Sequence, residues 1–311
     1  MSAAIPVHLV CGFLGAGKTT LLRRLLAEQP REERLAVLVN EFGRLGIDGR
    51  LLQGFSARVR ELRAGCICCE LRVDFQRALA ELVERFAPGR ILVEATGLAG
   101  AGDLAGAVEE AAARLPVAVG SVVTVVDAEL FPRRELFGAA YFDQIAAAEL
   151  LLLNKTDLVP PEEVEAMAAE LGEMNPRARL VPVVHCEVER ELVLNPLGGS
   201  RPLAPPAGLD LAPRPPAPAE HTGGFREFSF QEPGSFDPEC LLEWLAALPW
   251  RCLRVKGLVS LPAGPHLLNH TYRRPELSPW PGAGQGNHLA FVTWELEPQE
   301  VLPGLERCLV S

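Results

Sequence analysis

The residues best suited to chemistry lie between Gly12 and Thr19, in the run Gly-Phe-Leu-Gly-Ala-Gly-Lys-Thr. Glycines at this spacing allow the backbone to wrap around an anion and to point its N–H groups at it. Lys18 can then reach the β- and γ-phosphates of a nucleotide, and the Thr19 hydroxyl offers Mg²⁺ the oxygen ligand it prefers. The motif predicts a nucleotide-binding phosphate loop, with contacts from Gly12, Gly15, Ala16, Gly17, Lys18, Thr19 and Thr20.

The segments on either side of this run suit such a loop. Residues 7–10, Val-His-Leu-Val, predict a short buried strand, and the leucines at positions 21, 22, 25 and 26 recur with helical spacing. The glycines therefore fall on a strand-to-helix turn, where the start of the helix adds partial positive charge. An ordinary glycine-rich turn is the alternative, and the Lys-Thr pair at its end argues against it.

A carboxylate follows another predicted strand. Residues 91–93 are apolar and Glu94 comes directly after them, at the carboxyl end of the strand. An acid in this place can hold the water shell of Mg²⁺, and Gly97 permits close approach to the γ-phosphate. Lys18, Thr19 and Glu94 are therefore the predicted catalytic residues, and Thr19 and Glu94 the predicted Mg²⁺ ligands.

The apolar residues 35–39 predict a strand that leads to two more carboxylates, Glu41 and Asp48. We expect both to lie on a loop within reach of the Thr19 hydroxyl, where switch loops of phosphate-loop hydrolases sense Mg²⁺ and the γ-phosphate. A solvated acidic loop is the alternative for each, because charged side chains are usually exposed.

The sequence Asn-Lys-Thr-Asp at positions 154–157 follows a third apolar run, residues 150–153. An Asp carboxylate only accepts hydrogen bonds, so Asp157 can take two from guanine, at N1–H and the 2-amino group, whereas adenine has no amine there. We expect Asn154 to orient this loop and the Lys155 stem to lie over the base. The site should therefore prefer GTP, although a capping turn would use the same residue types.

Cys66, Cys68 and Cys69 form a compact group of thiols behind Gly65. Thiolates are soft ligands that suit Zn²⁺ or Cu(I), and a turn can fold them around one ion. The fourth ligand could be water, Glu41 or a group on a partner protein. The alternative is that these cysteines are small apolar side chains in a core.

Composition limits the remaining possibilities. The chain has 311 residues, of which 48% are hydrophobic, and its 30 basic and 40 acidic residues give a net charge of −10, which disfavours nucleic acid as a partner. It contains neither an apolar run of about 18 residues nor a basic N-terminal region, so we expect no membrane span and no signal peptide. A cytoplasmic location follows, and with it reduced thiols at all eight cysteines.

The pattern of segments predicts two domains. Residues 1–195 read as an α/β domain with a doubly wound sheet of the phosphate-loop type, and residues 196–224 as a proline-rich linker. Residues 225–311 read as a smaller α+β domain with strands at 225–230, 252–261 and 288–296, a helix capped by Asp237, and a last helix at 300–309. The histidines and tryptophans there lack ligand spacing and are interpreted as surface or packing residues.

Taken together, these motifs resemble the CobW-type GTPases of the metallochaperone class. Further runs that carry the resemblance are Asn-Glu-Phe-Gly at 40–43, Glu-Ala-Thr-Gly at 94–97, Asp-Gln-Ile at 143–145 and Arg-Val-Lys-Gly at 254–257. The resemblance implies that the three cysteines bind zinc or a related metal between switch regions, and that GTP binding and hydrolysis gate its transfer to a client metalloprotein. Two departures are Arg44, where the family usually has an acid, and the absence of a histidine-rich run, with only His221 in the linker.

The leading hypothesis is a GTPase that couples hydrolysis of GTP, to GDP and phosphate, to delivery of a thiolate-bound metal, with Zn²⁺ favoured. Cobalt handling for cobalamin synthesis is one alternative. A metal-regulated, GTP-dependent binding module is another. The sequence names no residue that activates the attacking water, and it leaves the client and the oligomeric state open.

Overall fold

The computed structural model describes residues 4–30, 32–41, 58–63, 70–95, 97, 100–197, 224–271, 274–281 and 286–310. The described residues fall into two compact units, one that ends before the segment 198–223 and one that begins after it.

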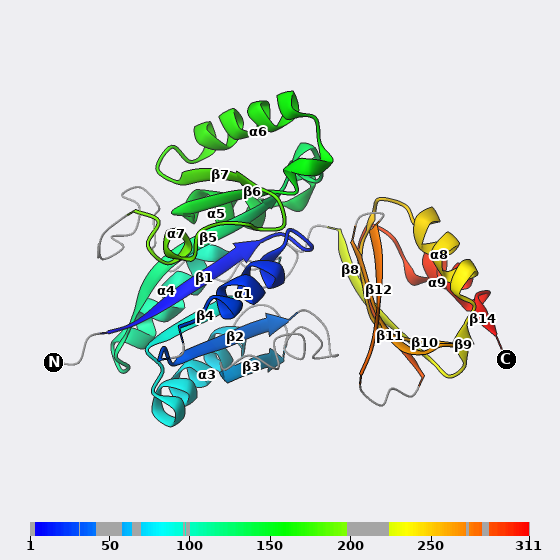
Figure 1. Cartoon of the computed structure of the whole chain (residues 1–311), viewed down its shortest axis with the longest axis horizontal. Coiled ribbons are helices and arrows are strands. Elements are labelled where there is room, and N and C mark those ends of the chain that lie inside the picture. Colours follow the sequence, from blue (N-terminus) through cyan, green and yellow to red (C-terminus); the bar gives the residue numbers. More distant parts are fainter. Residues whose placement is uncertain are drawn as a thin grey trace. The chain divides into compact units, whose positions relative to one another are not determined.

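The first unit is built on a parallel sheet of seven strands in the order β3-β2-β4-β1-β5-β6-β7 (Figure 1). The central strands are almost continuously buried, which is expected of parallel strands covered on both faces. Because all strands run the same way, their carboxyl ends meet at one edge. The strands are β1 (Ile5–Gly12), β2 (Leu35–Glu41), β3 (Arg58–Arg63), β4 (Arg90–Glu94), β5 (Val117–Asp127), β6 (Leu150–Asn154) and β7 (Arg179–Val183).

Helices cover both faces of this sheet. On one face the leucines of α1 pack with Val10, Val37 and Leu92, and on the other face α3 and α4 pack with Val7 and Ile91. This division follows from the alternation of side chains along each strand. The predicted doubly wound α/β fold is therefore confirmed. The helices are α1 (Lys18–Ala27), α3 (Glu70–Phe86), α4 (Ala101–Ala112), α5 (Ala139–Ala147), α6 (Pro161–Met174) and α7 (Arg190–Leu194), with the 3₁₀ helices η1 (Phe131–Phe137) and η2 (Thr156–Leu158).

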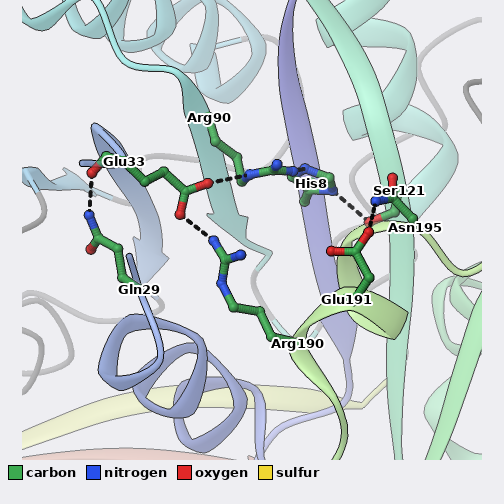
Figure 2. Close-up of polar contacts among 8 residues, drawn as sticks. All are labelled: His8, Gln29, Glu33, Arg90, Ser121, Arg190, Glu191 and Asn195. Carbon is green, nitrogen blue, oxygen red and sulfur yellow. Dashed lines mark hydrogen bonds and ion pairs between the residues drawn. The ribbon is translucent and has the colours of Figure 1, made fainter. Parts of the chain in front are cut away.

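A polar network, buried at His8 and Ser121 and partly buried elsewhere, lies toward the amino ends of the strands (Figure 2). His8 of β1 has Nδ1 2.8 Å from Ser121 Oγ, and Ser121 donates its own hydroxyl to Val193 O at 2.9 Å, so the imidazole Nδ1–H is the donor to Ser121. His8 Nε2 accepts from Arg90 Nη1 at 2.6 Å. Burial first, and then the charges of Arg90 and Arg190, lower the pKa of His8 to about 3, so the ring is neutral at physiological pH.

Glu33 completes this amino-end network as the counter-ion of two arginines. Arg90 Nε donates to Glu33 Oε1 at 2.8 Å, and Arg190 Nη2 donates to Glu33 Oε2. Gln29 Nε2 donates to the Glu33 carbonyl at 2.6 Å and so holds the segment that carries it. The network ties β1, β4 and β5 to α7 and to the α1–β2 connection (Figure 2).

The second unit is an antiparallel sheet of five strands in the order β12-β11-β10-β13-β8, with a small sheet of β14 and β9 beside it. Its core joins Val255, Leu289 and Phe291 of the large sheet to leucines and valine on two helices. Asp237 Oδ1 accepts from Cys240 N at 2.8 Å, which makes Asp237 the helix cap that its sequence predicts. The elements are β8 (Phe225–Glu232), β9 (Ser235–Phe236), α8 (Pro238–Ala247), β10 (Cys252–Leu261), β11 (Gly264–Thr271), β12 (Arg274–Pro279), β13 (Asn287–Trp294), α9 (Pro298–Glu306) and β14 (Leu309–Val310).

Four strands of this unit have no counterpart in the sequence-based prediction: the longer β11 and β12, and the two-residue β9 and β14. Strand β12 carries Pro275 and Pro279, which argue against a strand. Because β12 lies at the edge of the sheet, it needs ladder hydrogen bonds on one side only, and prolines are tolerated there. In the described part of the chain, no helix is long and apolar enough to cross a bilayer.

The expectation that all eight cysteines are reduced is wrong for one pair in this structure. Cys240 and Cys308 form a disulfide, with their Cα atoms 5.3 Å apart and 68 residues between them in sequence. Cys240 lies on α8 and Cys308 follows α9, and both belong to the same core. Their proximity is a result of helix packing, which the spacing of cysteines along the chain does not reveal. The other described cysteines, Cys11, Cys186 and Cys252, are buried free thiols.

Candidate nucleotide-binding site

The loop between β1 and α1 has the backbone that a phosphate cradle requires. Gly12, Gly15 and Gly17 have φ angles of 133°, 72° and 121°, a region that favours glycine. A Cβ atom on Gly12 would lie 2.2 Å from Val125 O, and one on Gly17 would lie 2.5 Å from Asn154 Nδ2. The loop is therefore closely packed against the ends of β5 and β6, and side chains at these positions would displace it.

Lys18 lies inside the curve of this loop. It is 6% exposed, and its Nζ donates to Gly12 O at 2.9 Å and to Phe13 O at 3.1 Å. Helix α1 begins at Lys18 itself, so the first N–H groups of the helix and the ammonium group face the same region. This arrangement suits an anion, because a phosphate oxygen can take the place of a carbonyl as the acceptor for Nζ. Thr20, also predicted to contact nucleotide, is exposed next to the loop.

Thr19 and Glu94 meet across the sheet edge. Thr19 Oγ1 donates to Glu94 Oε1 at 2.9 Å, and Glu94, the last residue of β4, is 5% exposed. A hydroxyl and a carboxylate beside a phosphate cradle are the hard oxygen donors that Mg²⁺ prefers. The donor set thus fits the predicted cation. The backbone also comes close here, since a Cβ on Gly97 would lie 2.7 Å from Leu14 N.

Asn154 connects the phosphate loop to the loop that follows β7. Its Nδ2 donates to Ala16 O at 2.7 Å, and its Oδ1 accepts from Cys186 N at 2.9 Å. The side chain is 2% exposed and both ends of its amide are used. Replacement of this residue would separate two loops that the chain places more than a hundred residues apart.

Lys155 and Asp157 of the same motif have different surroundings. Lys155 has φ 65° and ψ 35°, the left-handed conformation, and its Nζ lies 2.5 Å from Oδ2 of the buried Asp127. Asp157 lies in η2 and is exposed, so its carboxylate is open to a ligand. Both residues follow the end of β6: Lys155 is held by Asp127, and Asp157 is accessible to a ligand.

The turn after β7 contributes residues that belong to no recognised sequence motif. His185 and Cys186 have φ angles of 50° and 53°, and Arg24 Nε donates to His185 O at 2.8 Å. The Cys186 thiol lies 3.4 Å from Gly17 O, and burial raises its pKa to about 12. The available signal is topological, because ligands of open α/β sheets bind where strands end and the chain turns.

Helix α5 holds the segment that follows Glu94. Gln144 Nε2 donates to Gly97 O at 3.4 Å, and Asp143 Oδ2 accepts from Gly102 N at 3.2 Å near the start of α4. Burial, opposed by backbone hydrogen bonds and assisted by the charge of Asp103, raises the pKa of Asp143. The Asp-Gln-Ile run seen in the sequence therefore contacts the connection between β4 and α4.

Aromatic side chains fix the outer part of the phosphate loop. Phe13 stacks on Phe137 of η1, with ring centroids 4.0 Å apart, and meets the edge of Tyr141 of α5 at 6.1 Å. Phe13 is 2% exposed, so its side chain acts as an anchor for the loop rather than as a ligand contact.

The predicted thiolate metal site lies outside the described residues, because Cys66, Cys68 and Cys69 belong to the segment 64–69. Asp48 also lies outside them. Glu41 is the last residue of β2, and only its backbone is described. Within the described ranges, no group of three or more His, Cys, Asp or Glu residues is arranged to hold a metal ion.

The parallel sheet, the glycine-rich loop between β1 and α1, the acid at the end of β4 and the Asn-Lys-Thr-Asp run after β6 define a phosphate-loop nucleotide-binding domain. Residues 6–182 match the family described as CobW/HypB/UreG, nucleotide-binding domain, and residues 225–309 match the cobalamin synthesis protein cobW C-terminal domain. The chain belongs to the CobW family, as its motifs predict.

Curated relatives extend this result. The chain is 30% identical over 277 residues to the zinc chaperone YeiR of Escherichia coli (strain K12), a match that covers 83% of each protein. It is 35% identical over 229 residues to the zinc chaperone CobW of Pseudomonas aeruginosa, covering 62% of this chain and 60% of that protein. A third relative, the zinc-regulated GTPase metalloprotein activator 1 of Schizosaccharomyces pombe, is 33% identical over 195 residues, covering 58% and 46%. The chain thus aligns with less than two thirds of the length of several relatives.

Proposed function

We propose that this protein is a GTP-hydrolysing metallochaperone. It binds GTP with Mg²⁺, hydrolyses it to GDP and phosphate, and couples this cycle to delivery of a thiolate-bound metal, zinc, to a client metalloprotein. The observation that carries the proposal is the Asn154 bridge, which joins the phosphate loop at Ala16 O to the base-side loop at Cys186 N. One side chain thus links the two halves of a nucleotide site.

The choice of base rests on Asp157. Its exposed carboxylate follows the anchored Lys155 at the end of β6, and it can accept two hydrogen bonds from guanine. The adenine edge would present an acceptor to it and lose both bonds. GTP is therefore the proposed substrate.

The catalytic residues have distinct proposed roles. Lys18 exchanges the carbonyl oxygens of Gly12 and Phe13 for phosphate oxygens when nucleotide enters. Thr19 and Glu94 would hold Mg²⁺, which when bound neutralises charge on the β- and γ-phosphates. Glu94 keeps the Thr19 hydroxyl oriented through their 2.9 Å hydrogen bond.

Cargo binding is assigned to Cys66, Cys68 and Cys69, with Glu41 as a further ligand. Support comes from the softness of thiolate ligands and from the names of the zinc-chaperone relatives. The three cysteines lie in the chain between Glu41, at the end of β2, and Glu94, at the end of β4. Ordering of these flanking segments by γ-phosphate and Mg²⁺ would set the separation of the thiolates.

The test is whether nucleotide state changes zinc affinity. Competition titrations with a chromophoric zinc chelator, run with a non-hydrolysable GTP analogue and with GDP, should give affinities that differ by roughly 5- to 150-fold, the usual range for coupled sites. Zinc affinity should also fall as pH is lowered, because the ligands must be deprotonated.

The control variant is Cys68→Ser, which should abolish the difference while GTP turnover remains. Equal zinc affinities in the two nucleotide states would contradict the coupling. A zinc effect on association with another protein, without any effect on GTP turnover, would favour a regulatory binding module instead.

A further inference from the structure

A buried carboxylate outside the recognised motifs lies beside the base-binding loop. Asp127, the last residue of β5, is 2% exposed. Its Oδ1 accepts from Glu129 N at 3.0 Å, and its Oδ2 lies 2.5 Å from Lys155 Nζ. Both oxygens are therefore used, one to hold its own turn and one to hold the lysine.

The backbone brings these two residues together. Asp127 is the register partner of Asn154 in the pairing of β5 with β6, and Ala128 N donates to Asn154 O at 3.0 Å just beyond it. Lys155 then takes its left-handed conformation, which is uncommon for a residue with a long side chain. This turn allows the lysine stem to run back to the end of β5 instead of following the chain into η2.

Two other polar groups of this region, Arg134 and Tyr141, have surroundings of their own. Arg134 donates to Glu170 and lies over the Phe131 ring, 4.5 Å from its centroid. Tyr141 is buried, and burial, with the charge of Asp127, raises the pKa of its hydroxyl, so this group stays neutral. Asp127 forms an ion pair with Lys155, whose side chain keeps 20% of its surface exposed.

We infer that Asp127 is a positioning residue for the purine base. By holding the Lys155 ammonium it fixes the aliphatic stem of that lysine as an apolar surface against one face of the ring. A free lysine stem has several rotatable bonds and would lose that freedom on each binding event. Because the ion pair already restricts the lysine side chain in the free protein, less conformational entropy is lost when the base binds. The inference rests on the proposed function, since it assumes that a purine nucleotide occupies this end of the sheet.

This role separates Asp127 from its neighbours in the site. The face of a purine is the same kind of surface in guanine and adenine, whereas the hydrogen-bonding edge differs. Asp127 should therefore set how tightly a purine is held, and Asp157 which purine is held. The described contacts of Asp127 are with Glu129 N and Lys155 Nζ, not with the phosphate loop, so we expect phosphate binding to be independent of it.

The experiment compares two ligands on the full-length protein with Mg²⁺ present: GDP, and inorganic tripolyphosphate, which has no base. Isothermal titration should show that Asp127→Asn weakens GDP binding by about tenfold while tripolyphosphate binding stays the same. Asn keeps the size of the side chain and the acceptor for Glu129 N. Lys155→Met should weaken GDP binding to a similar extent, and it breaks the ion pair without altering the buried side chain.

The double variant decides the mechanism. If the two residues act through one contact, Asp127→Asn with Lys155→Met should be no weaker than Lys155→Met alone. Glu170→Gln is the matched control, a nearby ion-paired carboxylate whose loss should leave both ligands unaffected. The ratio of GDP to ADP affinity should be the same in Asp127→Asn as in the wild type.

Additive losses in the double variant, or unchanged GDP affinity in both single variants, would overturn the inference. So would an equal loss for GDP and tripolyphosphate, because that would mean a general distortion of the loop. A wild-type protein that binds ADP as tightly as GDP would instead overturn the proposed base choice. The Asp127 result would still stand in that case, since the ring-face contact serves either purine.

Discussion

The two ends of the parallel sheet hold charged side chains that are buried or partly buried, and they pair them in different ways. At the amino end, the guanidinium groups of Arg90 and Arg190 share the Glu33 carboxylate. At the carboxyl end, the Lys18 ammonium donates to backbone carbonyls, and the Glu94 carboxylate accepts from a hydroxyl.

This difference separates a structural network from a binding site. A guanidinium–carboxylate pair has fixed geometry, so a ligand would have to break several hydrogen bonds to enter. Carbonyl and hydroxyl partners are neutral. A phosphate oxygen can replace a carbonyl beside a lysine, and a metal ion can replace a hydroxyl hydrogen beside a carboxylate, and each exchange puts opposite charges in contact. The carboxyl end also holds a charged pair, Asp127 with Lys155. The positions open to phosphate or metal at that end are Lys18 and Glu94, whose described hydrogen bonds include neutral partners that a ligand can replace.

Removal of the lysine should produce the largest effect. Lys18→Ala should lower GTP turnover by at least about 100-fold, the usual cost of losing a charged donor at the reacting phosphates. Steady-state phosphate release with Mg²⁺ measures it. Zinc binding should survive, because the predicted thiolates lie elsewhere in the chain.

The matched control at the other end of the sheet is Arg190→Met, which should lower the melting temperature and leave turnover of the folded protein unchanged. Near-normal turnover in Lys18→Ala would mean that residues 12–19 are not the active phosphate loop, and the contrast between the two ends would fail.

Base recognition should show the next largest effect. Asp157→Asn should weaken GTP binding by about 2–3 kcal/mol, the worth of two charge-assisted hydrogen bonds, and should favour xanthosine triphosphate, because an amide offers a donor as well as an acceptor. Fluorescent-nucleotide titrations with GTP, ATP and xanthosine triphosphate as competitors measure the preference. An unchanged ratio of GTP to ATP affinity would contradict the assignment of Asp157.

The amino-end network should affect how folding stability depends on pH, and it should leave GTP turnover unchanged. The folded protein keeps His8 neutral down to a pKa of about 3, whereas the unfolded chain protonates it below its ordinary value of 6.5. The unfolded state therefore binds more protons between these two values, and stability is lost as pH falls from 6.5 toward 3, by up to about 1.4 kcal/mol per pH unit.

The His8→Asn variant, which carries no titrating ring, should be less stable than the wild type at pH 7.5, and the gap should narrow as pH falls below 6.5. Pulse proteolysis in urea, read from peptides of β1 and β4, reports the first unit, whereas all four tryptophans lie in the second. A gap that stays constant with pH would show that His8 is not buried as a neutral ring.

The site could be predicted in part because some of its chemistry is local. Residues 12–19 form a single loop, and its three glycines predict positive φ angles from the sequence alone, without knowledge of its tertiary contacts. Cys186 and Asp127 could not be found this way. Each meets its partner, Asn154 or Lys155, only because β5, β6 and β7 lie side by side. The roles of Cys66, Cys68 and Cys69 remain predictions from sequence.

The sequence by itself determined the doubly wound fold, the family and the phosphate loop. These depend on periodicity and on residues close together in the chain, where backbone preference and hydrophobic alternation act directly. Tertiary structure alone decided that Cys240 meets Cys308, that β12 carries prolines at a sheet edge, and that Asp127 holds Lys155. Such contacts join residues far apart in sequence, and packing of whole elements sets which of the many possible pairs come within bonding distance.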